Sequence, residues 1–271
     1  MVPVTDGSVS QDKITAYERD GAVCLRGRFT DWLEPLKRGI ETNIAQPGPI
    51  ATDHLLDDGK GRFFEDYCNW ERIPEYRDFV INSPAAALAG HFMGASRVRI
   101  FHEHLLVKEP GTGKATPWHH DMPYYCVQGR QVISIWLAID PVARDACPEF
   151  VAGSHLEDTL YYPRQFDDGS NYDFAGGGYE SVPDIDADRE SYRILSWDLE
   201  PGDALVFHFL TLHGAAGNRG ASRRRGFSTR WLGDDARFAG RPGATSPPYP
   251  DIGLKDGQPL REDWFPVMWR H

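Results

Sequence analysis

Hydrophobic residues recur at helical spacing through the N-terminal part of the chain, between short polar breaks. A first helical stretch ends at Asp20-Gly21, and the apolar segment 22–26 that follows it predicts a short strand. We expect a second helix at about 31–45 and further helix between 74 and 92. Ser83-Pro84 should divide the latter, because a helix usually ends before a proline and can restart with one.

From Arg97 onward the hydrophobic residues gather in short runs separated by glycine, proline and aspartate. Four of these runs predict strands, at 98–107, 131–139, 204–212 and 226–232. Short strands bounded by turns are typical of an antiparallel sandwich or barrel. The expected fold class is therefore mainly β, with flanking helices that pack on the outside.

The same pattern predicts a single domain over residues 1–271. We expect N-terminal helices over about 10–95, a β core over about 97–233, an insert at about 156–194, and a C-terminal segment, about 236–271, that wraps the surface. The insert is rich in aspartate, glycine and tyrosine and has little periodicity. It is too long for a simple connection, and such segments are commonly lids or binding loops.

The charge balance narrows the class of partner. Of 271 residues, 29 are lysine or arginine and 40 are aspartate or glutamate, which gives a net charge of −11. A chain this acidic repels phosphate backbones and anionic lipid unless its basic residues are concentrated on one face. We therefore expect a small-molecule substrate rather than nucleic acid or a membrane surface, and the sequence indicates no particular oligomeric state.

Cysteine usage and the absence of long apolar runs point to a cytoplasmic protein. The chain has 4 cysteines, far apart and without a Cys-x-x-Cys pair, as expected of reduced thiols. No apolar run approaches the roughly 20 residues that span a bilayer. The first residues have neither a basic nor an apolar region of the kind that marks a signal peptide.

Three residues form a candidate metal site. In the run PWHHDMPYY, His119 and Asp121 are two positions apart, so an extended chain places them on the same side. His213 closes the apolar run 204–212, and strand alternation puts His208 on the opposite face, which makes it the weaker candidate. Two imidazoles and one carboxylate are the ligand set of non-haem iron(II) oxygenases, which leaves positions open for co-substrate and dioxygen.

A candidate anion anchor follows the last histidine. Arg224 lies eleven residues after His213, at the start of a predicted strand. A guanidinium can hold a carboxylate through two parallel hydrogen bonds, as the far end of a metal-bound 2-oxo diacid requires. The alternative is that Arg223, Arg224 and Arg225 form a solvated basic turn, and for two of the three we adopt that interpretation.

With these residues in place, the chain resembles the phytanoyl-CoA dioxygenase family of iron(II)/2-oxoglutarate oxygenases. The resemblance covers most of the chain in an ordered set of motifs: Tyr17…Asp20-Gly21, Lys108-Glu-Pro-Gly, Pro117-Trp-His-His-Asp, Trp136, Gly153-Ser-His, Pro201-Gly-Asp…Phe207-His, and His213-Gly through Asn218 to Arg224. It implies a double-stranded β-helix, the cupin-like jelly roll. It also implies Fe(II), 2-oxoglutarate as co-substrate and O2.

The resemblance assigns roles to individual residues. His119, Asp121 and His213 would bind iron, and Arg224 would pair with the distal carboxylate of 2-oxoglutarate. Trp136 and Lys108 match positions in the co-substrate pocket, although Trp136 could equally be a core aromatic. Ala215 departs from relatives that carry a serine there to contact 2-oxoglutarate. Asp121 occupies the position where halogenating relatives have a small residue, so the chain resembles a hydroxylase.

The residues around the predicted ligands are aromatic. Trp118, Tyr124 and Tyr125 are candidate substrate-binding residues, because aromatic side chains can form the wall of a pocket. Large aromatic residues fill β-sheet cores equally well. For Tyr125 the prediction requires Pro123 to leave the strand extended, so that its side chain points the same way as that of Asp121.

The function expected is hydroxylation of a C–H bond of a small organic substrate, with release of succinate and CO2. Relatives act on acyl-CoA esters, amino-acid derivatives and secondary metabolites, so the resemblance implies a reaction class only. Two alternatives stay open. One is a cupin-like zinc or manganese enzyme, a hydrolase or isomerase, and the other is a non-catalytic sensor that binds 2-oxoglutarate or metal.

Overall fold

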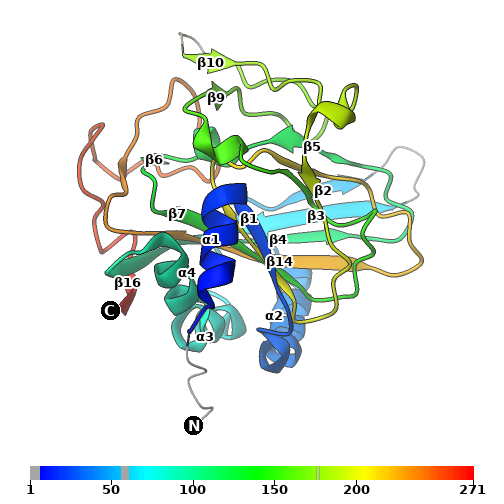
Figure 1. Ribbon diagram of the computed structural model, residues 1–271. Helices are drawn as coiled ribbons and strands as arrows, with labels where there is room; N and C mark the ends of the chain where they lie inside the picture. Colours follow the sequence, from blue (N-terminus) through cyan, green and yellow to red (C-terminus); the bar gives the residue numbers. More distant parts are fainter. Residues whose placement is uncertain (1–6, 56–60, 175, 177) are drawn as a thin grey trace.

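The computed structural model describes residues 7–55, 61–174, 176 and 178–271. Its strands form two antiparallel sheets that lie face to face, with the helices packed against the outer face of the larger sheet (Figure 1). The expected class, mainly β with flanking helices, is confirmed.

The larger sheet has the order β1-β12-β7-β14-β4-β3-β2, with β16 paired to the start of β4. Its strands are β1 (Ala22–Leu25), β2 (Thr52–Leu55), β3 (Arg62–Tyr67), β4 (Arg97–Lys108), β7 (Val132–Ala138), β12 (Ala204–His208), β14 (Arg224–Leu232) and β16 (Val267–Arg270).

The smaller sheet has the order β11-β8-β13-β5. Its strands are β5 (Thr116–His119), β8 (Glu149–Val151), β11 (Ile194–Leu195) and β13 (His213–Ala215). Two short pairs complete the β structure: β9 (Leu160–Tyr161) runs parallel to β10 (Tyr179–Glu180), and β6 (Val127–Gln128) runs antiparallel to β15 (Arg237–Phe238).

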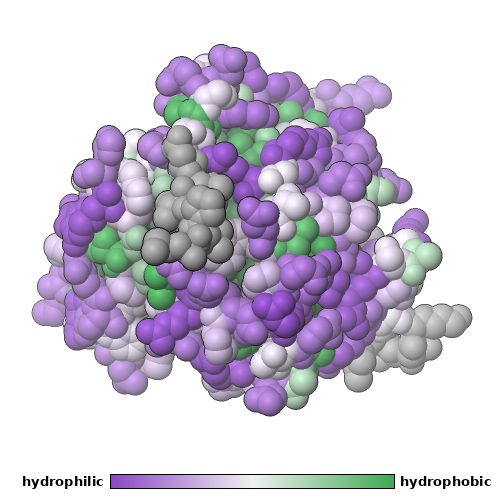
Figure 2. All heavy atoms as spheres, turned by 90° about the horizontal axis from the view of Figure 1, so that it is seen from below, coloured by the Kyte–Doolittle hydropathy of each residue, from purple (hydrophilic) through white to green (hydrophobic). Residues whose placement is uncertain are grey.

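The helices are α1 (Gln11–Asp20), α2 (Leu33–Ala45), α3 (Pro74–Asn82) and α4 (Ala85–Met93). Short 3-10 turns lie at η1 (Thr30–Trp32), η2 (Met122–Tyr124), η3 (Ser154–Leu156) and η4 (Arg189–Ser191). The predicted division at Ser83-Pro84 is confirmed, because α3 ends at Asn82 and α4 starts at Ala85. Seen from the helix side, the surface is mainly hydrophilic, with hydrophobic residues in small separate groups (Figure 2).

Strand alternation gives the larger sheet two different faces. One face supplies Val23, Ile135, Phe227 and Trp231 to the main hydrophobic core, where they pack with helix residues such as Leu36. The other face points toward the smaller sheet and carries both apolar and polar side chains. The space between the two sheets is therefore where polar groups from distant parts of the chain can meet.

The predicted run 204–212 is not one strand. β12 ends at His208, and residues 209–212 turn the chain into β13 of the smaller sheet. The prediction by strand alternation that His208 and His213 lie on opposite faces therefore assumed a wrong strand boundary. The strands β2 and β3 were not predicted, because Arg62, Glu65 and Asp66 interrupt the hydrophobic pattern of β3.

Within the part of the chain that the structure describes, no helix has both the length and the apolar character needed to cross a membrane.

Candidate active site

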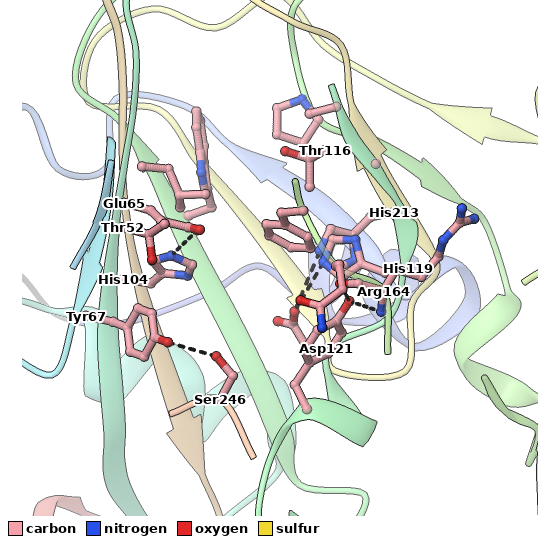
Figure 3. A pocket seen from close by; sticks show the side chains of 18 of the residues that line it. Thr52, Glu65, Tyr67, His104, Thr116, His119, Asp121, Arg164, His213 and Ser246 are labelled. Carbon is pink, nitrogen blue, oxygen red and sulfur yellow. Dashed lines mark hydrogen bonds and ion pairs between the residues drawn. The ribbon is translucent and has the colours of Figure 1, made fainter. Parts of the chain in front are cut away.

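A cavity of about 310 Å³ lies between the two sheets (Figure 3). Residues of the larger sheet form one wall, and the ends of β5 and β13 form another. The segment 164–167 with Tyr172, and Ser246-Pro247 from the C-terminal region, complete the lining. The cavity thus joins the β core, the predicted insert and the C-terminal segment at one place.

His119 and His213 face each other across the smaller sheet. They are directly paired in register between β5 and β13, with ring centroids 4.2 Å apart. The Nδ1 atom of His119 lies 2.8 Å from the carbonyl oxygen of Pro117, and that of His213 lies 2.9 Å from the carbonyl oxygen of Thr211. Because a carbonyl only accepts, each Nδ1 carries the proton and each Nε2 keeps its lone pair for a metal.

Asp121 completes the cluster from the turn that begins η2. Its Oδ1 atom lies 3.7 Å from Nε2 of His119 and 3.8 Å from Nε2 of His213. One ligand atom from each of the three residues lies within 4.8 Å of the others, and all three side chains are buried. The Ser134 hydroxyl donates to Oδ2 of Asp121 over 3.0 Å, which leaves Oδ1 toward the histidines.

The protonation states suit a cation. Burial and the neighbouring His213 lower the pKa of His119 to about 3, and burial lowers the pKa of His213. Burial alone would raise the pKa of Asp121, but the charge of Arg230 and the contacts with both histidines outweigh it and hold this pKa below its usual value. Two neutral imidazoles and an ionised carboxylate are a donor set that fits Fe(II).

Arg230 is a site residue that was not predicted from the sequence. Its guanidinium is buried beside the cluster, with Nη2 3.7 Å from Oδ2 of Asp121 and Nε donating to the Tyr125 hydroxyl over 2.9 Å. It stands opposite Ser134 in the register of β14 and β7. Strand alternation from Arg224 would have placed Arg230 on the same face, and this was the available signal.

Arg224 and Lys108 are paired in register on β14 and β4, at the other end of the cavity. Arg224 is buried, and burial lowers its pKa to about 10. It donates to the carbonyl of Ala146, and no described carboxylate pairs with it. By contrast, Arg223 pairs with Glu109, and Arg225 pairs with Asp140. A buried arginine without a carboxylate partner has the character of an anion anchor.

Lys108 has less capacity to bind an anion directly. Its ammonium group donates to the carbonyls of Lys114 and Ala216 and to the Thr116 hydroxyl, at 2.9, 3.4 and 3.1 Å. These three bonds use its three protons. Burial, followed by the charge of Arg224, lowers the pKa of Lys108 well below its usual value. Lys108 therefore holds the loops around the anion end together.

Thr116 supplies a hydroxyl group next to Ala215, where some relatives carry a serine. It is the register partner of that residue. Its Oγ1 accepts from Lys108, so its own hydroxyl proton is available toward the cavity that it lines. Trp136 also lines the cavity, with 8% of its surface exposed, so it is both a pocket residue and a member of the inner core.

The three predicted substrate aromatics have different positions. Tyr124 and Tyr125 line the cavity, whereas Trp118 lies outside the lining and packs with Val151 and Leu212. Adjacent strand residues point to opposite faces, so Trp118 turns away where His119 turns in. The extended path assumed for PWHHDMPYY is wrong, since β5 ends at His119.

Part of the predicted insert is hydrogen-bonded to residues adjacent to the candidate metal ligands. The Tyr124 hydroxyl accepts the backbone N–H of Arg164 over 2.6 Å and donates to the Arg164 carbonyl over 2.8 Å. Nε2 of His120 accepts the backbone N–H of Tyr161 over 3.0 Å. The Phe166 ring then packs at 5.0 Å from the His119 ring. Residues 164–167 of this segment thus line the cavity and are held by residues next to the ligands.

Comparison with known proteins agrees with this geometry. The family model for phytanoyl-CoA dioxygenase (PhyH) matches residues 17–226. A probable phytanoyl-CoA dioxygenase from Caenorhabditis elegans is 26% identical over 272 residues, which cover 89% of this chain and 81% of that protein. The peroxisomal phytanoyl-CoA dioxygenase of Rattus norvegicus is 25% identical over 148 residues, 52% of this chain and 41% of that protein.

Solved structures share the fold. The 2-oxoglutarate-dependent carbocyclase SnoK from nogalamycin biosynthesis superposes with a TM-score of 0.74 at 20% identity, covering 97% of this chain and 98% of that one. The epimerase SnoN, in complex with Fe3+, 2-oxoglutarate and nogalamycin RO, gives 0.74 at 21% identity over 96% and 98%. EctD from S. alaskensis gives 0.68 at 18% identity over 95% and 87%. These neighbours confirm the double-stranded β-helix. The chain belongs to the phytanoyl-CoA dioxygenase family of iron(II)- and 2-oxoglutarate-dependent oxygenases.

Proposed function

We propose that this enzyme hydroxylates a C–H bond of a small organic substrate. One oxygen atom of O2 enters the substrate as a hydroxyl group, and the other enters succinate as 2-oxoglutarate loses CO2. The observation that carries the proposal is the convergence of Nε2 of His119, Nε2 of His213 and Oδ1 of Asp121 in a buried cavity. The same cavity holds Arg224, which pairs with no carboxylate among the described residues.

His119, Asp121 and His213 would hold the iron. When bound, Fe(II) supplies the activation of dioxygen that no amino-acid side chain can provide. The chain's own part is to keep both imidazoles neutral with Nε2 unprotonated, through the Pro117 and Thr211 carbonyls. Ser134 and Arg230 hold the second oxygen of Asp121.

Arg224 would anchor the distal carboxylate of 2-oxoglutarate, and Thr116 would donate the hydroxyl that Ala215 lacks. The two residues line the same cavity, and Lys108 lies beside both. Arg224 is its register partner across β14 and β4, and Thr116 accepts a hydrogen bond from its ammonium group. A charge-assisted pair inside a buried site is stronger than one in water. Lys108 would contribute by fixing the surrounding loops.

The presence of Asp121 supports oxygenation rather than halogenation, because its carboxylate fills the position that a halide would need. The nogalamycin enzymes are a carbocyclase and an epimerase, so this fold hosts other oxidative outcomes. The buried Arg224 also argues against a zinc or manganese hydrolase or isomerase, which has no use for an anion anchor at that end. The intact ligand set argues against a sensor.

We propose that residues 156–194 act as a lid over a small-molecule substrate. Tyr161 and Arg164 are hydrogen-bonded to residues adjacent to the metal ligands, so binding at the site would change the position of this segment. Tyr124 and Tyr125 would form part of the substrate wall. Because Cys24, Cys68, Cys126 and Cys147 are all free thiols, we also propose a reducing compartment, the cytoplasm, as the site of action.

Product analysis tests the reaction. Iron-loaded enzyme, supplied with 2-oxoglutarate and O2, is screened against candidate substrates for stimulated succinate release, and products are weighed by mass spectrometry. Hydroxylation predicts the gain of one oxygen atom per succinate formed. A product that has lost two hydrogen atoms and gained no oxygen would show desaturation or ring closure of the substrate and would contradict hydroxylation. His119→Ala should abolish both iron binding and succinate formation, and succinate release by that variant would overturn the ligand assignment.

A further inference from the structure

A second group of polar side chains lines the cavity and has no part in the reaction proposed above. It consists of His54 on β2, Glu65 and Tyr67 on β3, His104 on β4, and Ser246 from the C-terminal region. We call it the Glu65 wall. Figure 3 shows Glu65, His104, Tyr67 and Ser246 on one side of the cavity and His119, Asp121 and His213 on the other.

The wall is organised around one carboxylate shared by two imidazoles. Oε1 of Glu65 lies 3.1 Å from Nε2 of His54, and Oε2 lies 3.2 Å from Nε2 of His104. The Glu65 side chain is 11% exposed, and those of His54 and His104 are 14% and 13% exposed. No arginine or lysine in the described residues forms an ion pair with Glu65, so its side-chain partners there are the two imidazoles.

The hydrogen-bond directions define what this wall can recognise. An ionised carboxylate only accepts, so each imidazole turns its Nε2 proton toward Glu65. In the neutral rings each Nδ1 is then an acceptor, and the structure gives neither Nδ1 a partner among the described residues. With both rings neutral, the wall presents two acceptor nitrogens beside the Glu65 carboxylate.

Neighbouring rings hold the two imidazoles in place. His104 packs edge-on against Tyr67, with centroids 5.1 Å apart, and the Tyr67 hydroxyl bonds to Ser246 over 2.9 Å. His54 stacks on Phe63 at 5.3 Å. The acceptor positions are thus fixed before any ligand arrives, which reduces the entropy lost on binding.

The cavity is asymmetric in charge. Arg224 and Lys108 stand at the end of the cavity where β14 and β4 pair in register, and Glu65 pairs with Leu106 on β4, two residues from Lys108 and roughly 7 Å along the strand. A dicarboxylate is drawn to the cationic end and repelled by Glu65. An alkyl chain against the Glu65 wall would leave buried polar atoms without partners, which weakens its binding.

We propose that the Glu65 wall binds the substrate through its hydrogen-bond donors, and that the substrate is a small neutral or cationic molecule bearing hydroxyl or amino groups. The inference rests on the proposed function, because it takes the opposite side of the cavity to be the iron and 2-oxoglutarate site. Hydroxyl and ammonium groups share the donor chemistry that the wall requires.

Ligand binding to the zinc-loaded enzyme tests the inference without turnover. Binding of 2-oxoglutarate is measured first by calorimetry, and its absence in the wild-type protein would overturn the proposed function. With 2-oxoglutarate bound, saturation-transfer NMR then compares four probes on one ring: cyclohexanediol, the corresponding diamine, the dimethyl ether and the dicarboxylate. We expect the diol, the diamine or both to bind, and the ether and dicarboxylate to bind at least fivefold more weakly.

Two variants and a control assign that binding to the wall. Glu65→Gln and His104→Phe should each weaken diol or diamine binding at least fivefold and leave 2-oxoglutarate affinity within twofold, which also reports an intact fold. Asp53→Asn, the same chemical change in the exposed Asp53–Arg62 pair beside His54, should match the wild type. The inference is overturned if the ether or dicarboxylate binds as well as the donors, if neither donor probe binds, or if both variants bind like the wild type.

Discussion

Gly226 on β14 lies directly against the indole of Trp136 on β7. A Cβ atom at position 226 would overlap Cε2, Cζ2 and Nε1 of that ring. The backbone there is not in the left-handed region, so the glycine is required by the close approach of the ring and not by its own conformation. Gly226 therefore leaves room for the Trp136 indole against β14, at a register position between Arg224 and Arg230.

Gly226→Ala should impair co-substrate binding, because the indole that the new methyl group displaces lines the cavity. Overpacking of a tight site costs about 1–3 kcal/mol, so we expect the KM for 2-oxoglutarate to rise roughly tenfold or more. Gly240→Ala is the matched control, since nothing lies within 4 Å of a Cβ at that position. Equal KM values for the two variants would show that Trp136 does not shape the pocket.

Arg224→Ala should weaken 2-oxoglutarate binding about a hundredfold, since a charge-assisted pair in a buried site contributes about 2–3 kcal/mol. Calorimetry on the zinc-loaded protein measures this directly. Arg223→Ala is the control, because Arg223 pairs with Glu41 and Glu109. If the Arg223 variant lost as much affinity as the Arg224 variant, the anchor would have to be assigned differently.

Thr116→Val should raise the Kd for 2-oxoglutarate about fivefold, which corresponds to one neutral hydrogen bond of ~1 kcal/mol. The variant also removes the acceptor of the Lys108 contact. Thr116→Ser keeps the hydroxyl and should bind 2-oxoglutarate like the wild type. An affinity loss in the serine variant as large as in the valine variant would show that keeping the hydroxyl does not preserve binding, which would contradict its role.

The sequence was most informative where chemistry and local pattern coincide. The sequence alone shows residue types and the order of motifs, and these were enough to predict His119, Asp121 and His213. The structure brings the three together. Alternation within β14 could have added Arg230. The end of the strand predicted at 204–212 was wrong. β12 ends at His208 because the chain crosses to the smaller sheet there, and the local hydrophobic pattern does not show where a chain changes sheets.

The Glu65 wall shows a second limit of local patterns. Glu65 and Asp66 lie inside β3 and interrupt the hydrophobic pattern expected of a strand. The two histidines that hydrogen-bond to Glu65 come from β2 and β4. A buried charge is tolerated only with partners, and those partners are set by sheet order. The sequence alone therefore cannot distinguish a polar strand of this kind from a loop.

Ser134→Ala should lower metal affinity roughly tenfold, because partners of metal-bound carboxylates typically account for 10–100-fold in affinity. Ser134 donates to Oδ2 of Asp121 over 3.0 Å and fixes the direction of Oδ1. Ser228→Ala is a close control: its hydroxyl is buried on the same sheet face and has no hydrogen-bond partner among the described residues. Competition against a chelator of known affinity measures the metal affinity of each variant. Equal metal affinities for the two variants would remove Ser134 from the support of the site.

Glu65 should make the folded state sensitive to acid. Burial alone would raise its pKa, but the hydrogen bonds from His104 and His54 outweigh it and lower the pKa from 4.5 to about 2. Between these values the unfolded chain binds the proton and the folded chain does not, so stability falls as the pH falls. From pH 5 to pH 3 this group should account for a loss of ~2 kcal/mol in the free energy of unfolding. Urea unfolding of wild type and Glu65→Gln at both pH values isolates that amount, with Asp53→Asn as the control. Parallel losses in wild type and Glu65→Gln would mean that the two imidazoles do not stabilise the ionised carboxylate.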